Sequence, residues 1–516
     1  MNARVRALAT LAALLGACCP QPPARIATTT PVEPPDTTSP GGEGGAGGGA
    51  ATAATPALDW AKAGPGWATA PEAGPEPRFS PPSATSFRLG NGLQVVLVEN
   101  HRLPLVSLRV VNSRAGARED GARPGLAAMT ADLLDEGAGS LTALTLPEAL
   151  ERLGADLSVS TSADAAIVSL DLLASTLPDG LTLLGDVMLR PTFAAADVER
   201  IKSDRLAALA TRPDSPRRVA SLVFDRVTFG AHPYGHPGDG FATSVGKLAR
   251  ADVLAFWRRQ YAPAAATLVI AGDVDRATVE PLLEQTLGAW KAPAPRPAKV
   301  APARAHAGRR LVVVDRPDAP QTVIVAGRLG VSWDDPRYAA AEVINTAIGG
   351  SFAARLNNRL REQLGYTYGI FSSFWRGRLT GAWSVTSSIK TAATVDAVRE
   401  ALAILDDARG KELPAAELAK AQQLLIRGQP QDFETNAGIA GAFQRLVVAG
   451  LPLDWYATWA DRLRAVDAAA ARTAAHELWA DLDLIVVGDW KVVGAGLSAL
   501  GVPVTRVDAD GNPVAP

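Results

Sequence analysis

The segment Leu268-Val-Ile-Ala-Gly-Asp273 decides the fold, because a segment of the same kind returns as Leu484-Ile-Val-Val-Gly-Asp489. Each is a short apolar run of the kind that forms a buried strand. A second pair repeats with it: Pro104 and Pro320 each follow one apolar run of strand length and precede another. Both pairs are 216 positions apart (488 less 272, and 320 less 104). The chain is therefore predicted to hold two copies of one unit.

Each copy is predicted to mix strands with helices. Apolar and β-branched runs predict strands, and a stretch that alternates apolar with polar residues predicts two paired strands with one face in the core. The strands are predicted over 93–98, 105–111, 157–173 and 268–271, and the helices over 123–135, 145–153, 196–211 and 250–260. The predicted fold class is α+β, with an antiparallel sheet in each half and helices packed on one side of it.

A linker separates the two copies. Residues 291–308, KAPAPRPAKVAPARAHAG, are rich in Pro and Ala, a composition typical of a connecting segment. The predicted N-terminal half therefore covers 83–290, and the predicted C-terminal half covers 309–508.

The composition is that of a globular protein. Of 516 residues, 47% are hydrophobic and 20% are charged, and the formal net charge is -2. A charge so close to zero gives no electrostatic reason to expect a nucleic-acid partner. Beyond the N-terminus, no apolar run reaches the roughly 20 residues that a membrane-spanning helix needs.

The N-terminus carries the pattern of an export signal. Arg4 and Arg6 precede an apolar stretch at 7–15, which predicts a signal peptide over residues 1–17. The stretch ends in Leu15-Gly-Ala-Cys18, which resembles the lipobox of bacterial lipoproteins, so Cys18 is predicted to be lipidated. An ordinary signal peptide with chance cysteines is the alternative.

The segment after the signal is predicted to be a tether. Residues 18–82 are rich in Pro, Gly, Ala and Thr, and such a segment cannot bury enough apolar surface to order itself. Cys19, directly after the lipidated residue, resembles the pattern that is sorted to the outer membrane. The predicted location is therefore the cell envelope, at the periplasmic face of the outer membrane.

Four segments resemble the insulinase (pitrilysin) family of metallopeptidases. The resemblance extends from Phe87 to Val504. They are FGAHPYGHP at 229–237, FWRRQYAPAAATLVIAGDVD at 256–275, GGSFAARL at 349–356 and LREQLGYTY at 360–368. The resemblance implies that the two halves form a clamshell around a chamber. It also implies zinc in the N-terminal half, and an arginine and a tyrosine from the C-terminal half that hold the scissile carbonyl.

The zinc motif of that family is absent here. GLAAMTADLLDEG, residues 125–137, stands where the family carries H-x-x-E-H, with Ala128 and Asp132 at the two histidine positions and Ala131 at the catalytic glutamate. Two His at i and i+4 grip zinc from one helix face, and the Glu polarises the bound water. The family's third ligand is a glutamate on a later helix, where Glu199 and Asp204 are more typical of solvated charges. No metal or other cofactor is therefore expected in this chain.

The remaining histidines offer no replacement for the zinc ligands. His232 and His236 are separated by Pro233 and Gly235, which indicates a loop rather than a helix face, and the matching family loop is not a zinc site. His476-Glu477 begins like H-E-x-x-H, but position 480 is Ala. The other two histidines are His101 and His306.

The substrate-binding pair that the resemblance implies is Arg361 with Tyr368, and Arg359 with Tyr366 is the nearest alternative. A guanidinium and a phenol are both hydrogen-bond donors, and a carbonyl that becomes an oxyanion needs donors. The alternative is a surface arginine at a helix end and a tyrosine on a half-buried strand, neither with a function.

Small bacterial members of the family often work as pairs, with zinc in one chain and the arginine–tyrosine pair in the other. The resemblance therefore implies a catalytically inactive subunit that forms a heterodimer with a zinc-bearing peptidase and binds unfolded or extended peptides, which add as a strand to an exposed sheet edge. A stand-alone peptide-binding or scaffold protein is one alternative. An active zinc metalloendopeptidase with an atypical site is the other.

Overall fold

The structure, a computed structural model, describes residues 79–296 and 298–514. The predicted signal peptide, Cys18 and the tether up to residue 78 lie outside the described residues. No helix in the described ranges is long and apolar enough to cross a membrane. Residues 291–296 and 298–308, within the predicted linker, belong to no helix or strand.

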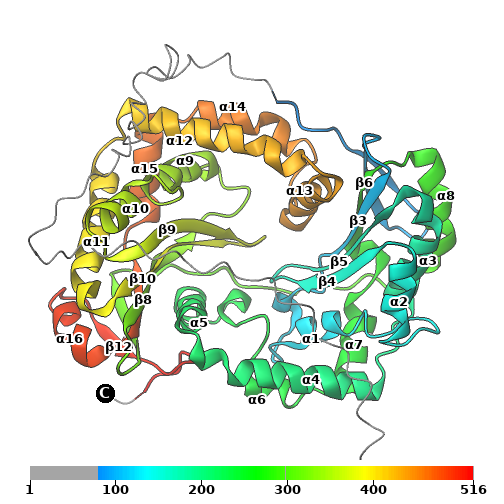
Figure 1. Ribbon diagram of the computed structural model, residues 1–516, viewed down its shortest axis with the longest axis horizontal. Helices are drawn as coiled ribbons and strands as arrows, with labels where there is room; N and C mark the ends of the chain where they lie inside the picture. The colour runs from blue at the N-terminus through cyan, green and yellow to red at the C-terminus, as the bar shows by residue number, and fades with distance from the viewer. Residues whose placement is uncertain (1–78, 297, 515–516) are drawn as a thin grey trace, which may run out of the picture. The chain divides into compact units, whose positions relative to one another are not determined.

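The first half is built on a six-stranded sheet (Figure 1). Its strand order is β1-β2-β6-β3-β5-β4. The strands are β1 (Thr85–Arg88), β2 (Gln94–Glu99), β3 (Leu105–Asn112), β4 (Asp156–Thr161), β5 (Ala166–Leu173) and β6 (Ala266–Gly272). The predicted strand at 268–271 is the centre of β6, which lies between β2 and β3.

The second half repeats this design, as the 216-residue offset predicts. Its strand order is β12-β7-β11-β8-β10-β9. The strands are β7 (Arg310–Asp315), β8 (Gln321–Gly330), β9 (Thr367–Arg376), β10 (Gly381–Lys390), β11 (Asp483–Gly488) and β12 (Val504–Arg506). Strand β11 lies between β7 and β8 just as β6 lies between β2 and β3. Two copies of an α+β unit, as expected from the sequence, are therefore confirmed.

The sheets differ from the expectation in one respect, because their pairing is mixed. Strand β6 pairs antiparallel with β3 and parallel with β2, and β11 repeats this with β8 and β7. Strands β2 and β3 follow each other in opposite directions, so a strand inserted between them must run parallel to one of the two. The parallel pairs come from this insertion, which short-range sequence patterns do not encode.

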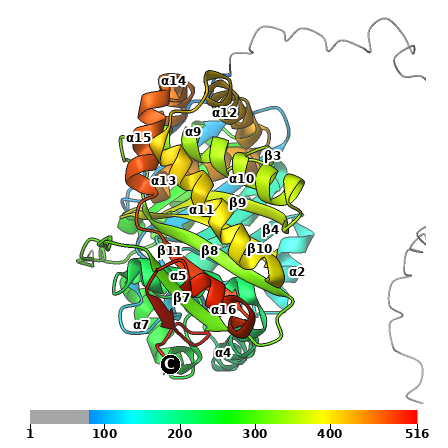
Figure 2. The same ribbon diagram turned by 90° about the vertical axis from the view of Figure 1, so that its left-hand side faces the viewer.

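Helices pack against both sheets. The first half contains α1 (Leu126–Asp132), α2 (Thr145–Arg152), α3 (Leu177–Leu189), α4 (Ala195–Ala210), α5 (Pro216–Phe229), α6 (Ala242–Val245), α7 (Arg250–Gln260) and α8 (Arg276–Thr286). The second contains α9 (Tyr338–Ile348), α10 (Arg355–Asn357), α11 (Thr394–Gly410), α12 (Ala415–Gly428), α13 (Asn436–Ala449), α14 (Trp459–Arg464), α15 (Ala468–Leu478) and α16 (Trp490–Ser498). Figure 2 shows α9, α10 and α11 in front of strands β8 to β10.

The two halves exchange one helix each. Helix α5 of the first half packs on β8 and β11 of the second, and α13 of the second half packs on β3 and β6 of the first. Phe224 of α5, for example, lies in one cluster with Val325 and Ile485. Each half covers one side of its sheet with its own helices, as predicted, and the other side receives the helix of its partner half. All six residues of β11 are buried, as expected for a strand covered on both faces.

Candidate functional site

Helix α1 lies beside the edge strand β4 of the first sheet. It is shorter than predicted and begins after Gly125, whose φ of 97° is a left-handed conformation that glycine adopts without strain. The Asp120 carboxylate accepts hydrogen bonds from the Gly125 N–H at 2.8 Å and the Ala127 N–H at 2.6 Å. Burial raises the pKa of Asp120 to about 7. Ala128 and Ala131 are both buried, at 8% and 0% exposure, so this helix face offers methyl groups where ligands would stand.

Asp132 forms an ion pair with an arginine that the sequence analysis missed. Its Oδ2 lies 2.5 Å from Nη2 of Arg205 on α4, the helix on which a third ligand was sought. Glu199 and Asp204 of the same helix point to solvent, each 68% exposed, and pair with Lys202 and Arg200. They are solvated charges, as expected. The position on α4 that faces α1 therefore holds a cation, and only the helix packing reveals it.

The other charged groups around α1 do not assemble a metal site. Burial, followed by the charges of Glu136 and Asp132, raises the pKa of Asp135 to about 6. Glu136 pairs with Arg200. Among the described residues, no three or more His, Cys, Asp or Glu side chains lie close enough together to hold a metal ion. Two alanines and an aspartate already bound to an arginine do not fit zinc, which takes nitrogen, sulfur or carboxylate ligands.

The structure separates the two candidate arginine–tyrosine pairs. Arg359, on the π-helical turn Asn358–Gln363, donates twice to Glu400 of α11, at 3.0 Å each, and Tyr366 packs against the core of the second half. Arg361 lies over the ring of Phe352, 4.5 Å from its centroid, and the Tyr368 side chain is 89% exposed. Arg361 also forms an ion pair with Glu362 at 3.1 Å, so of the four residues only Tyr368 is exposed and without a structural contact described above.

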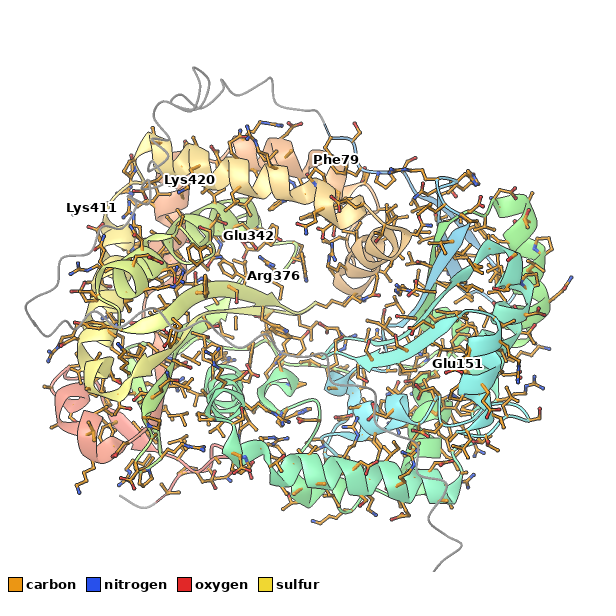
Figure 3. All side chains as sticks on the ribbon, in the orientation of Figure 1. Phe79, Glu151, Glu342, Arg376, Lys411 and Lys420 are labelled. Carbon is orange, nitrogen blue, oxygen red and sulfur yellow. The ribbon has the colours of Figure 1, made fainter. Side chains whose placement is uncertain are left out.

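Strand β9, which begins just before Tyr368, forms one edge of the second sheet, and β12 forms the other. Its outer positions carry Phe371 and Trp375, both 44% exposed. Its far end is anchored by Arg376, which pairs with Glu342 of α9, and Figure 3 shows these two side chains directed toward each other. The Arg376 guanidinium also lies 4.3 Å from the ring centroid of Tyr338. The edge strand is therefore held firmly at one end and presents aromatic side chains along its length.

A buried polar network joins the turns at the ends of the two edge strands. Asp164, in the turn between β4 and β5, lies 2.6 Å from Nη1 of Arg118 and accepts a 2.6 Å hydrogen bond from the Tyr234 hydroxyl. Its second oxygen accepts from the Arg378 N–H, in the turn between β9 and β10, at 2.8 Å. Because Arg118 and Asp164 are almost fully buried, this network fixes edge strand β4 of one half near edge strand β9 of the other.

Comparisons with known proteins agree with this architecture. The family profile described as "Insulinase (Peptidase family M16)" matches residues 94–228, and the one described as "Peptidase M16 inactive domain" matches residues 247–425. An uncharacterized zinc protease of Mycobacterium tuberculosis is 30% identical over 320 residues, which cover 61% of this chain and 72% of that protein. A non-peptidase homolog of Helicobacter pylori is 22% identical, over 72% of this chain and 85% of that protein.

Solved structures with the same fold include relatives of the inactive type. The peptidase M16 inactive domain from Pseudomonas fluorescens matches with a TM-score of 0.74 and 26% identity, over 79% of this chain and 98% of that chain. A protease from Helicobacter pylori matches with the same TM-score at 19% identity, over 79% of this chain and 100% of that chain, and at this identity the likeness shows the fold alone.

Proposed function

Since this chain belongs to the insulinase family of peptidases (peptidase family M16), we propose that it is a catalytically inactive member which completes the peptide-binding chamber of a zinc-bearing partner. The observation that carries the proposal is the ion pair between Asp132 and Arg205, 2.5 Å apart, at the place where the family's metal helix packs. A guanidinium so close to the helix repels a divalent cation, and Ala128 and Ala131 supply neither a ligand nor a base.

The names of the relatives support the first part of the proposal, the loss of the reaction. Zinc proteases and a non-peptidase homolog both occur among the similar proteins, so the fold exists with and without the reaction. Ala128, Ala131 and Asp132, at the ligand and base positions of the motif, support the proposal that this chain has lost the reaction.

The chain would contribute two hydrogen-bond donors and an unpaired strand edge to the partner. Tyr368 is exposed, and Arg361 lies seven positions before it on the preceding turn. Both groups donate hydrogen bonds and would stabilise the oxygen of a carbonyl attacked by a zinc-activated water in the partner. The unpaired edge of β9 offers backbone groups to which an extended peptide adds as a strand.

We also propose that the protein is exported and anchored by a lipid on Cys18, at the periplasmic face of the outer membrane. The support is the lipobox-like Leu15-Gly-Ala-Cys18 and the Pro- and Gly-rich segment after it. Metabolic labelling with a fatty acid tests this proposal. Label is expected on the native protein and not on the Cys18→Ala variant, and label retained by that variant contradicts the proposal.

The partner role is tested by purification from the native membrane, followed by peptide-cleavage assays with and without a chelator. We expect a zinc-bearing insulinase-type chain to co-purify and the mixed complex to cleave peptides in a chelator-sensitive way. This chain alone should contain no stoichiometric zinc in elemental analysis. One zinc per chain, lost together with peptidase activity, would instead identify an active metalloendopeptidase.

Substitution of the tyrosine tests the contribution of this chain to the reaction. Loss of one preorganised oxyanion donor typically lowers the rate on the order of 10²–10³-fold, so Tyr368→Phe should lower turnover of the complex by about that factor. Tyr366→Phe is the matched control, and complex formation is followed by gel filtration. Full activity in both variants, or full activity of the partner alone, would leave this chain as a scaffold.

A further inference from the structure

A pocket of about 350 Å³ lies between helix α5, the turn 229–238 and strands β9 and β10. It brings together segments of both halves, since Asp225 and His236 come from the first and Trp375 and Ser384 from the second. Its size falls in the range of small-molecule sites. The pocket is separate from the ion pair of α1 and from the exposed Tyr368, none of which lines it.

Aromatic rings form one wall of this pocket. Trp375 of β9 meets Tyr234 with centroids 5.0 Å apart and Phe229 with centroids 5.7 Å apart, both edge to face. Phe229 and Tyr234 meet in the same manner at 5.8 Å. The face of an aromatic ring carries partial negative charge and attracts cations.

A carboxylate without a partner stands in the same pocket. Asp225, on α5, makes no hydrogen bond or ion pair with any residue that the structure describes. Burial alone raises its pKa to about 7. It lies four residues before the C-terminal end of α5 at Phe229, where the helix dipole adds negative potential. By exposed area Asp225 is half-buried, so a cation in the pocket can reach it and offset the free-energy cost of its partial desolvation.

The histidine of the pocket adds no positive charge to it. The Nδ1 atom of His236 is buried without a hydrogen-bond partner, and burial lowers the pKa of this histidine, so that its ring is neutral at neutral pH. The lining, all of it within the described residues, contains no lysine or arginine. The pocket therefore holds one acid and several aromatic faces but no positive charge of its own.

We propose that this pocket binds an organic cation of the alkylammonium or guanidinium type, with Asp225 as its ion-pair partner and Trp375, Tyr234 and Phe229 as its aromatic wall. The cation is either a free small molecule or the side chain of a lysine or arginine in a peptide, since both present the same chemistry. A divalent metal fits poorly, because it needs several oxygen ligands and the pocket has one carboxylate. The inference does not depend on the partner role, because binding is a property of this chain alone.

Calorimetric titration of the full chain, without any partner, tests the proposal. The probes are agmatine and n-butylammonium, with the uncharged 1-butanol as the matched analogue, and a short capped peptide with one lysine, with its Nε-acetylated form as the second matched pair. We expect saturable binding of cationic probes and none of the neutral ones. Binding of free amines identifies a small-molecule site, whereas binding of the lysine peptide alone identifies a basic side chain as the ligand.

Two variants assign the binding to this pocket. A hydrogen bond to a charged group contributes about 1.5–3 kcal/mol, so Asp225→Asn should weaken binding about tenfold to a hundredfold. Trp375→Leu should weaken it as well, and because Trp375 is half exposed the fold should survive. Glu151→Gln, on the exposed face of α2 (Figure 3), is the control and should bind as the native protein does. Equal binding of the neutral analogues, native affinity in Asp225→Asn, or no saturation by any cation up to about 10 mM overturns the proposal.

Discussion

Asp132 and Arg205, 73 residues apart in the chain, meet between α1 and α4. The Arg205 side chain is 14% exposed and that of Asp132 is 42% exposed. An ion pair with one largely buried member depends on both groups, because removal of one leaves a partly desolvated charge behind. The helix that carries Ala128, Ala131 and Asp132 is thus paired with a cation on α4.

Restoration of the motif alone should not restore the metal. The triple variant Ala128→His, Ala131→Glu, Asp132→His leaves Arg205 facing the new ligands, and we expect it to purify without stoichiometric zinc. Addition of Arg205→Glu removes the cation and supplies a carboxylate of the kind that the family uses as its third ligand, so zinc content should rise. Elemental analysis measures both variants, and circular dichroism checks their fold. One zinc per chain in the triple variant would show that Arg205 does not prevent binding.

The unpaired acid Asp225 predicts a pH dependence of stability. Burial raises its folded pKa to about 7, above the value of about 3.9 in an unfolded chain. Its contribution to stability is therefore fully present below about pH 4 and lost as the pH rises through about 7. Between about pH 5 and about pH 8, thermal unfolding should show a larger fall in stability for the native protein than for Asp225→Asn. Glu151→Gln is the control, and parallel pH profiles of Asp225→Asn and the native protein would contradict the prediction.

At the scale of elements, α5 and α13 have equivalent roles in the two halves. Alternate residues of β6 face opposite sides: Ile270 lies in the core with the helices of its own half, and Val269 lies in the core that includes α13. Gly327 of β8 allows the close approach of α5, since a Cβ there would lie 2.9 Å from the ring of Phe224. Each half therefore depends on a helix of the other half to cover the second face of its sheet.

Shortening a buried side chain on α5, which packs on the other half, should destabilise the molecule strongly. Phe224 is 5% exposed, and its replacement by alanine removes a buried ring, which costs about 3–5 kcal/mol. Phe371→Ala, at a position 44% exposed on β9, is the matched control and should change stability by about 0.5 kcal/mol. Chemical unfolding followed by fluorescence compares the two. A loss in Phe224→Ala no greater than that of the control would mean that α5 contributes little to the core.

For the described part of the molecule, 79–296 and 298–514, the polar network around Asp164 is a buried link between the halves. The Arg118 and Asp164 side chains are 4% and 5% exposed, and the Arg378 backbone joins them from the second half. An apolar contact reinforces this link, since Val111 and Ile167 of the first sheet pack against Val447. The relative position of the two edge strands depends on these contacts.

Removal of the Asp164 carboxylate should loosen the turn between β9 and β10. Asp164→Ala removes the 2.6 Å ion-pair partner of the buried Arg118 and leaves it only Glu119, at 3.4 Å, and the Ser113 carbonyl, at 2.8 Å. Loss of one member of a buried ion pair costs about 3–5 kcal/mol, and the remaining partners place this change at the lower end. Asp396→Ala is the control, because Asp396 pairs with Arg399 at 3.4 Å on α11 and both side chains are more than half exposed, where a pair contributes about 1 kcal/mol or less. Hydrogen exchange at residues 377–380 should accelerate in Asp164→Ala only. Unchanged exchange there would indicate that other contacts hold the turn.

The amino-acid sequence by itself determined the two copies of an α+β unit, most of the strands and helices, and the loss of the zinc motif. These features are local, because strand and helix periodicity and the identity of Ala128, Ala131 and Asp132 need no knowledge of distant contacts. Only the tertiary structure decided that Arg205 rather than Glu199 or Asp204 faces Asp132, that Arg359 is engaged while Tyr368 is exposed, and that Asp225 and Trp375 share a pocket. Such pairs are set by the packing of helices and strands that are far apart in the chain. The pocket of Asp225 and Trp375 forms only when α5 of the first half packs on the sheet of the second half.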